Sequence, residues 1–220
     1  MTGKGREQIV AAITATGVVA VIRLKEPERL RAVVDALVEG GVRALEVTMT
    51  VPGAIELISR LAPTLPAGFL LGAGTVVDRD TARRAIGAGA QFIVGPVFRP
   101  EVITACHELD VPVMPGCFSP TEILTAWEAG ADVVKVFPAT ALGPGYFKDI
   151  RGPLPQVKLM PTGGVTVENA GEWITAGAVA VGAGTSLLDA KAIAAGEYSI
   201  ITEKARRIVA NVKAAREGQR

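Results

Sequence analysis

The residue that most directly suggests chemistry is Lys135. Seven of the eight lysines fall in expected loops, helices or strand beginnings, whereas Lys135 interrupts the apolar run VVKVFP at residues 133–138. If this run is a β-strand, alternation places Lys135 on one face with Val133 and Phe137 and puts the neighbouring valines on the other. Burial disfavours the charged form of an amine, and a neutral amine can attack a carbonyl to form a Schiff base. The alternatives are a lysine that reaches solvent at the rim of the fold or one that pairs with a carboxylate.

A carboxylate occupies an equally unusual position. The run ALEVTM at residues 44–49 predicts a strand that carries Glu46 and Thr48 on one face. Burying a carboxylate costs free energy unless the group is paired or has a function. Glu46 could form an ion pair with Lys135, and it could also move protons directly or through one water molecule. Because the two roles are compatible, Lys135 and Glu46 together are the candidate catalytic residues.

Eight apolar runs predict the elements that position these residues. Each run is apolar enough to be buried on both faces, and segments of helical periodicity separate the runs. The runs are 18–23, 44–49, 70–76, 92–96, 111–116, 133–138, 158–164 and 178–184. Eight alternating strands and helices predict an α/β fold, a single-domain (β/α)8 TIM barrel over residues 1–220. An N-terminal helix at 6–17 should pack under or beside the barrel, and the last outer helix should occupy 199–220.

The predicted barrel brings the strand ends together. Active sites of such barrels lie at the C-terminal ends of the strands. The second and sixth strands face each other across the lumen, so Glu46 and Lys135 should converge. Arg23 ends the first strand, where its guanidinium could reach inward to bind a carboxylate or point outward into solvent. Thr75 follows the third strand and adds a hydroxyl at the top of the lumen, as does Thr48 on the second.

Two glycine-rich turns indicate where a phosphate could bind. The turn PTGGV at residues 161–165 follows the seventh predicted strand, and GAGTS at 182–186 follows the eighth. Barrels commonly hold a phosphate at these two turns, with bare backbone N–H groups and a helix N-terminus. Helices are expected to begin near Thr166 and near Leu187. The alternative is two tight connections that bind no ligand.

Composition argues against several other classes of protein. The formal net charge is +1 and only two Tyr and two Trp occur, so nucleic acid is not expected as a partner. No apolar run reaches the length of a membrane span and no signal-peptide core is present, which predicts no membrane partner and a cytoplasmic location. Cys106 and Cys117 are expected to be small apolar fillers. The single histidine, His107, falls in a predicted helix, so neither a zinc site nor a histidine-dependent hydrolase is expected.

Four motifs, LEVTMT, GAGTV, VVKVFPA and PTGGV, occur in this order at the predicted strands. Together they resemble the 2-keto-3-deoxy-6-phosphogluconate (KDPG) and 4-hydroxy-2-oxoglutarate (KHG) aldolases, over nearly the whole chain from GVVAVIR to GAGTSL. The resemblance implies that Lys135 forms the Schiff base and that Glu46 shuttles protons. It also implies a pyruvyl pocket and a phosphate site; the matching residues are Thr75, Pro96 and Phe137 for the first and Gly163, Gly164 and Thr185 for the second. Gly184 of the GAGTS turn joins the predicted phosphate site.

The resemblance also implies a reaction. A class I aldolase of this family would cleave KDPG, a small keto acid, into pyruvate and glyceraldehyde 3-phosphate, without a metal or an organic cofactor. The family further implies a homotrimer. The same chemistry on the galactonate epimer of KDPG or on KHG stays open. So do a phosphosugar isomerase or epimerase that uses no covalent lysine, and a barrel that only binds a phosphorylated acid.

The sequence departs from the family pattern at Thr50. In that pattern an arginine occupies this position and contacts the carboxylate of the substrate. Arg23 lies on the neighbouring predicted strand and is expected to supply the missing guanidinium. Thr185 stands where serine is common, and this exchange keeps the hydroxyl.

Overall fold

The structure, a computed structural model, describes residues 5–218. The predicted domain of residues 1–220 and the last helix predicted to reach Arg220 extend beyond this part of the chain, so their outermost residues lie outside the described residues. Within residues 5–218 the chain forms nine short strands, paired in parallel. They are β1 (Val18–Ile22), β2 (Ala44–Thr48), β3 (Leu70–Gly74), β4 (Phe92–Val94), β5 (Val113–Met114), β6 (Gly116–Cys117), β7 (Val134–Val136), β8 (Leu159–Pro161) and β9 (Val181–Ala183).

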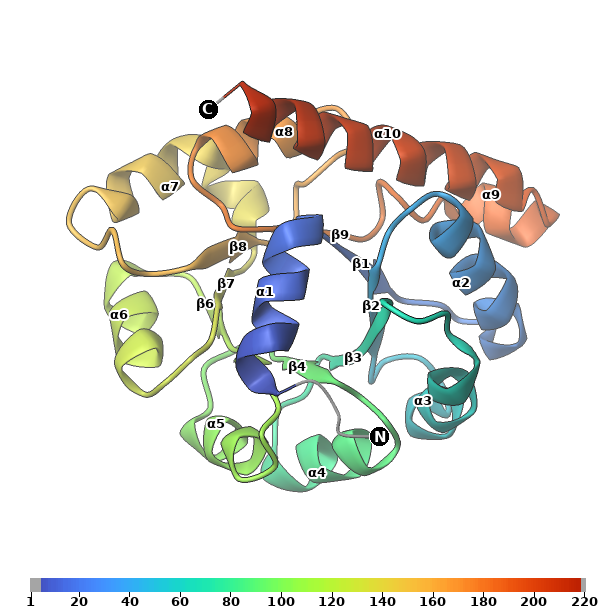
Figure 1. Cartoon of the computed structure of the whole chain (residues 1–220), viewed down its shortest axis with the longest axis horizontal. Helices are drawn as coiled ribbons and strands as arrows, with labels where there is room; N and C mark the ends of the chain where they lie inside the picture. The colour runs from blue at the N-terminus through green and yellow to red at the C-terminus, as the bar shows by residue number, and fades with distance from the viewer. Residues whose placement is uncertain (1–4, 219–220) are drawn as a thin grey trace.

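Helices follow most of the strands and form an outer layer around them (Figure 1). The α-helices of the described residues are α1 (Arg6–Thr16), α2 (Leu30–Glu39), α3 (Ala54–Leu61), α4 (Arg79–Gly87), α5 (Pro100–His107), α6 (Pro120–Glu128), α7 (Gly143–Arg151), α8 (Ala170–Thr175), α9 (Ala190–Ala195) and α10 (Tyr198–Glu217). Short 3-10 helices are η1 (Pro27–Arg29), η2 (Ala62–Thr64) and η3 (Ala139–Ala141). Ser119 caps α6, since its hydroxyl accepts a hydrogen bond from the Glu122 N–H at 3.3 Å.

The strands curl around a common lumen in a TIM-barrel-like arrangement. One sheet has the order β5-β4-β3-β2-β1-β9, and the other has the order β6-β7-β8. A single bridge between Thr162 and Gly182 joins the second sheet to β9. The predicted parallel α/β arrangement is therefore confirmed, whereas the hydrogen bonds divide the strands into two sheets instead of one continuous ring.

Pro115 explains this division. The fifth predicted strand, residues 111–116, is broken at Pro115, which has no N–H to donate to a neighbouring strand. Just before the proline, the carbonyl of Met114 accepts a hydrogen bond from the N–H of Gly95 at 3.0 Å, so β5 is paired with β4. The carbonyl of Pro115 itself accepts the N–H of Lys135 at 3.0 Å. The N–H of Asp132, just before β7, also donates to the carbonyl of Val113 at 3.1 Å. The segment therefore bonds to the β7 side before and at the proline, and the ladder is interrupted where the proline has no N–H.

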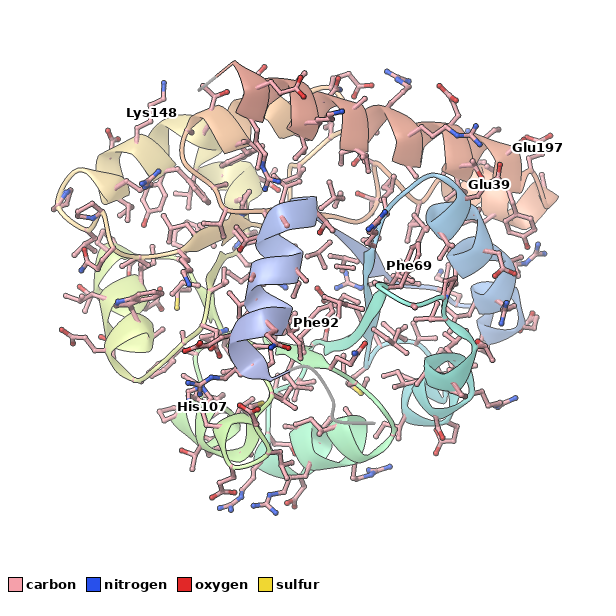
Figure 2. The ribbon with its side chains drawn as sticks, viewed as in Figure 1. Glu39, Phe69, Phe92, His107, Lys148 and Glu197 are labelled. Atoms are coloured by element: carbon pink, nitrogen blue, oxygen red, sulfur yellow. The ribbon has the colours of Figure 1, made fainter. Side chains whose placement is uncertain are left out.

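Helix α1 closes the N-terminal end of the lumen, as predicted for a helix under the barrel. Its side chains Ile9, Val10 and Ile13 are buried in one apolar cluster with residues that point inward from the strands. These inward residues include Val19, Ala44, Leu70, Phe92, Val133 and Met160. In Figure 1 α1 lies across the middle of the ring of strands, and in Figure 2 Phe92 lies beside it. Water is therefore excluded from this end of the lumen.

Arg216 of α10 fastens α1 in this position. Its guanidinium donates hydrogen bonds to the carbonyl oxygens of Thr14 at 2.5 Å, Ala15 at 2.7 Å and Val179 at 2.9 Å. A cation at the C-terminal end of a helix satisfies carbonyls that have no partner within the helix. The last long helix thus holds the first one against the lumen.

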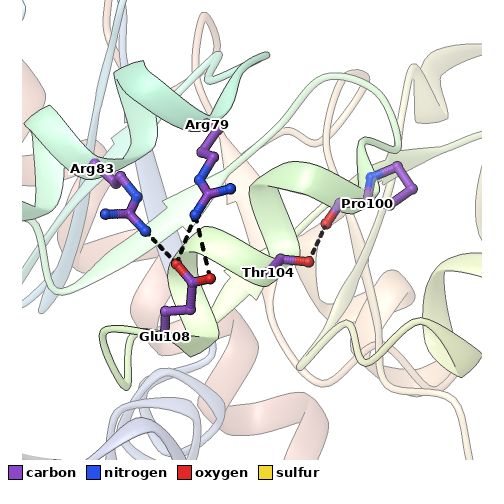
Figure 3. Close-up of polar contacts among 5 residues, drawn as sticks. All are labelled: Arg79, Arg83, Pro100, Thr104 and Glu108. Atoms are coloured by element: carbon purple, nitrogen blue, oxygen red, sulfur yellow. Dashed lines mark hydrogen bonds and ion pairs between the residues drawn. The ribbon is translucent and has the colours of Figure 1, made fainter.

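The outer helices are also joined by charged contacts. Arg79 and Arg83 of α4 both contact the carboxylate of Glu108, which follows α5, and Arg79 lies 3.1 Å from it (Figure 3). Such exposed ion pairs contribute little to stability, so they orient neighbouring helices more than they hold the fold together. Residues 5–218 contain no helix that combines the length and apolar character of a membrane span.

Candidate active site

Lys135 lies in the middle of β7 and points into the lumen, as strand alternation predicts. Val133 belongs to the inner apolar cluster, whereas Val134 and Val136 belong to the outer cluster between strands and helices. The side chain of Lys135 is only 4% exposed, and its Nζ lies 4.9 Å from the centre of the Phe137 ring. Burial lowers the pKa of Lys135 below the ordinary value of 10.5, more than the nearby Glu46 raises it, and the charge of Arg23 adds to the lowering. The amine is thereby shifted toward its neutral, nucleophilic form.

Glu46 reaches the same lumen from β2. It is 0% exposed, and burial raises its pKa above the ordinary value of 4.5, although the charges of Lys135 and Arg23 act in the opposite direction. Neither carboxylate oxygen has a hydrogen-bond partner among residues 5–218. The direct contact with Lys135 considered from the sequence is therefore not made. A buried carboxylate without a partner is costly, and it is available to accept a proton from a bound molecule.

Arg23 lies at the upper end of the lumen, directly after β1. Its side chain is exposed, and its charge acts on both Lys135 and Glu46. Together with Thr50 and Lys25 it lines a cavity of about 670 Å³ between the ends of β1 and β2 and the start of α9. Of the two orientations predicted for Arg23, the structure shows the one open to solvent. Its binding of a substrate carboxylate stays a prediction.

Thr48 is buried and uses its hydroxyl within the protein. Its Oγ1 donates to the carbonyl of Ile22 at 3.1 Å and lies 2.7 Å from Oγ1 of Thr50. These contacts join β2 to the end of β1 immediately before Arg23. The Thr48 hydroxyl thus holds the neighbouring strand end, and its contact with a substrate stays a prediction.

The residues predicted to line a pyruvyl pocket follow β3, β4 and β7. Thr75, Pro96 and Phe137 are each partly buried. Thr75 has φ 60°, in the left-handed region that residues other than glycine rarely adopt. Such strained residues concentrate at functional sites, because the surrounding structure must hold them in place.

The two glycine-rich turns have free backbone donors. Within residues 5–218 the N–H groups of Gly163, Gly164, Thr185 and Ser186 have no acceptor. Gly163 and Gly164 adopt φ 89° and φ 73°, so successive N–H groups of this turn are presented in a conformation that glycine allows. Gly184, partly buried, starts a turn in which its carbonyl accepts from the N–H groups of Leu187 and Leu188. The arrangement can bind an anion.

The helices after these turns begin later than predicted. Instead of starting near Thr166, α8 starts at Ala170, because Thr166 and Asn169 exchange side-chain hydrogen bonds in a preceding turn. Instead of starting near Leu187, α9 starts at Ala190, where Asp189 accepts from the N–H groups of the first turn. The free N–H groups therefore belong to turns and not to helix N-termini.

Sequence reasoning missed two hydroxyls at the site. Oγ1 of Thr162 is buried without a hydrogen-bond partner among residues 5–218, and alternation along the seventh run, residues 158–164, could have identified it as facing the lumen with Met160. Thr140, in η3, lies over the glycine turn: a Cβ atom added at Gly163 or Gly164 would come within 3.2 Å of its Oγ1. No local pattern signals this second contact.

The remaining candidates lie away from Lys135. Cys106 and Cys117 are buried, and burial raises the pKa of each thiol to about 12, so both are unreactive fillers as predicted. His107 lies in the outer layer near α5 (Figure 2), where its Nε2 is 3.4 Å from the carboxylate of Asp132. It takes no part in the lumen.

A barrel-like fold with a desolvated amine and a separate desolvated carboxylate is suited to a lyase that works through an imine. Residues 9–204 match the family model described as KDPG and KHG aldolase. The chain is 38% identical over 195 residues to the 2-dehydro-3-deoxy-phosphogluconate aldolase of Treponema pallidum, covering 88% of this chain and 92% of that protein. It is 35% identical over 204 residues to the KHG/KDPG aldolase of Escherichia coli, covering 92% and 95% of the two chains. The chain therefore belongs to the KDPG and KHG aldolase family, and it is a lyase.

A solved structure of the family has the same fold. The KDPG aldolase from Legionella pneumophila, with pyruvate captured at low pH as a covalent carbinolamine intermediate, superimposes with a TM-score of 0.83 at 34% identity. The match covers 90% of this chain and 97% of that one. The family assignment made from four motifs is thus confirmed by both sequence and structure.

Replacing Glu46 by Gln is expected to raise the free energy of unfolding at about pH 7, with a smaller effect at about pH 4. Burial raises the pKa of Glu46 in the folded state. The folded protein therefore resists an ionisation that the unfolded chain undergoes freely. This penalty is absent below the unfolded pKa and grows as the pH rises toward the folded pKa. Urea unfolding at both pH values measures it.

Glu56→Gln is the matched control, because Glu56 is exposed on α3. It should leave the difference between the two pH values unchanged. If Glu46→Gln destabilised the protein at neutral pH, a compensating partner of the carboxylate would have to exist.

Proposed function

We propose that this protein is a class I aldolase that cleaves KDPG into pyruvate and glyceraldehyde 3-phosphate. The observation that carries the proposal is that two buried groups face the same lumen without contact. They are Lys135, whose pKa is lowered, and Glu46, which has no hydrogen-bond partner among residues 5–218. An imine-forming enzyme needs a neutral amine and a group that accepts and returns protons. The names of the two relatives support KDPG as the substrate.

The proposed reaction begins with the neutral amine of Lys135. Nζ attacks the C2 ketone, and the C2 oxygen takes one proton from the amine and one from solvent and leaves as water, which yields an iminium ion. The carboxylate of Glu46, directly or through one water, accepts the proton of the C4 hydroxyl. The electron pair of the C3–C4 bond then moves toward the iminium nitrogen, and glyceraldehyde 3-phosphate departs. The remaining enamine takes a proton at C3 from Glu46, and hydrolysis releases pyruvate and the amine.

Substrate recognition uses the ends of the strands. The carboxylate of the substrate pairs with Arg23 and with the hydroxyl of Thr75, while Pro96 and Phe137 enclose the three-carbon part. The phosphate binds the free N–H groups of Gly163, Gly164 and Thr185, in the turn that Gly184 opens. Support comes from the positive charge of Arg23 beside the lumen and from these unused donors. No metal or organic cofactor takes part in this proposal.

KHG is a second candidate substrate, since the relative from Escherichia coli is named for both compounds. KHG ends in a carboxylate attached to C4, whereas KDPG ends in a phosphate on C6, so KHG is the shorter anion for the same turns. Comparing kcat/KM for the two compounds decides between them. A higher value for KHG would overturn KDPG as the main substrate while leaving the chemistry intact.

The proposal includes a homotrimer in which the two sheets act as one (β/α)8 barrel. The bridge between Thr162 and Gly182 supports closure of the barrel. Three exposed apolar side chains after β3, β4 and β6, namely Val77, Val97 and Phe118, support self-association. Sedimentation velocity that found only monomer would contradict the trimer.

Reduction with borohydride in the presence of pyruvate should attach a three-carbon acid to Lys135, as read by mass spectrometry of its peptide. Lys135→Ala should remain folded, lose the adduct and fall below about a thousandth of wild-type activity, because the covalent electron sink is gone. Lys158→Ala, at an exposed lysine just before β8, is the control and should keep both. An adduct on another lysine, or an active Lys135→Ala, would overturn the assignment.

Arg23→Ala should raise the KM for pyruvate in the condensation direction, at a cost of about 1.5 to 3 kcal/mol, because a charge-assisted hydrogen bond is lost. Adding Thr50→Arg should recover part of the loss. Lys25→Ala is the matched control, since Lys25 is a cation that lines the same cavity. An unchanged KM in Arg23→Ala would show that Thr75 and backbone N–H groups bind the carboxylate of the substrate without Arg23.

A further inference from the structure

Strand β3 lacks side chains where it faces Glu46. Leu70 of this strand belongs to the inner apolar cluster, so alternation directs positions 72 and 74 into the lumen as well, and both are glycine. Gly74 is buried, belongs to the β-strand and has a negative φ. Other residues adopt this backbone readily, so the conformation of the chain does not require glycine here.

The space that a side chain at position 74 would fill is occupied by Glu46. A Cβ atom added at Gly74 would lie 2.5 Å from Cδ and 2.6 Å from Cγ of Glu46, and closer still to Oε1. Atoms that are not bonded to each other do not come this close, so the side chain of Glu46 would have to move. All three of the nearest atoms belong to Glu46, which makes the conflict specific to this one side chain.

The carboxylate leans along its strand to reach this space. The Cα partner of Glu46 across the sheet is Gly72, whereas the carboxyl group lies against Gly74, two residues nearer the C-terminal ends of the strands. No hydrogen bond from residues 5–218 holds the carboxylate there. Its position is therefore determined by which space the neighbouring strand leaves open.

We propose that Gly74 is a positioning residue for proton transfer. The missing side chain creates a slot on β3 that keeps the carboxylate of Glu46 near the top of the lumen, within reach of the substrate atoms bound to Lys135. This inference rests on the proposed aldolase function. Gly72 provides a contrast, because a Cβ atom there would overlap the ring of Phe92, an apolar packing group.

Gly74→Ala separates the two halves of the reaction. Forming the imine needs Lys135, whereas exchange of the methyl protons of pyruvate with deuterated water also needs the carboxylate to remove a proton. We expect borohydride trapping of pyruvate to persist and the exchange, followed by NMR, to slow about 100-fold, the cost of displacing a reacting group by about 1 Å. Gly87→Ala is the control, because a Cβ atom there meets nothing within 4 Å.

A second variant tests whether the clash itself is the cause. Alanine at position 46 lacks Cγ, Cδ and Oε1, the three atoms that a Cβ atom at Gly74 would meet. Gly74→Ala should then slow the residual exchange by less than about threefold relative to Glu46→Ala alone, which is the non-additivity expected of residues in contact. If Gly74→Ala alone fails to fold, Glu46→Ala should restore folding.

Each outcome has a distinct meaning. An exchange rate in Gly74→Ala equal to that of the wild-type protein would overturn the proposal. So would an equal slowing of exchange by Gly74→Ala in the wild-type protein and in Glu46→Ala, or a double variant that fails to fold as Gly74→Ala alone does. Failure of the wild-type protein to trap pyruvate would instead overturn the proposed function, and the inference with it. A loss of trapping confined to Gly74→Ala would show that the glycine acts on Lys135 and not on Glu46.

Discussion

Moving Lys135 and Glu46 from water into the lumen removes the hydration that stabilises their charged forms. Burial accordingly lowers the pKa of the amine and raises that of the carboxyl group. A direct ion pair would offset part of this cost, and it would also hold the amine of Lys135 in the charged form that cannot attack a carbonyl. Glu46 has no partner among residues 5–218, so the protein keeps the two groups close and separate. The remaining features of the fold serve to maintain this condition.

Several parts of the fold maintain the surroundings of Lys135 and Glu46. Helix α1 seals the N-terminal end with an apolar layer, and Arg216 fastens the end of that helix to the body of the protein. The glycines of β3 leave room inside for the carboxyl group, and the ends of the strands present Arg23 and the free N–H groups of two turns. Arg23 and these N–H groups therefore lie at the C-terminal ends of the strands, the end opposite α1.

The sequence predicts the reactive pair because strand alternation is a local property. A lysine within VVKVFP and a glutamate within ALEVTM must face the same lumen if those runs are strands, and no knowledge of distant contacts is needed. The break at Pro115 was readable in principle, since proline cannot donate to a sheet. The slot at Gly74 and the hydroxyl of Thr140 above the glycine turn depend on which side chains meet across strands and loops. Periodicity carries no information about such contacts.

Burial shifts the amine of Lys135 toward its neutral form without a direct ion pair, and a titration of Lys135 tests this directly. Lysines labelled with ¹³C at Cε report the protonation of Nζ by NMR, and Lys135→Ala identifies the signal. We expect the titration of Lys135 in the wild-type protein to have its midpoint below the ordinary pKa of 10.5. In Glu46→Gln the midpoint should be lower still, because Glu46 raises the pKa of Lys135. A midpoint at or above 10.5, or a rise in Glu46→Gln, would contradict this expectation.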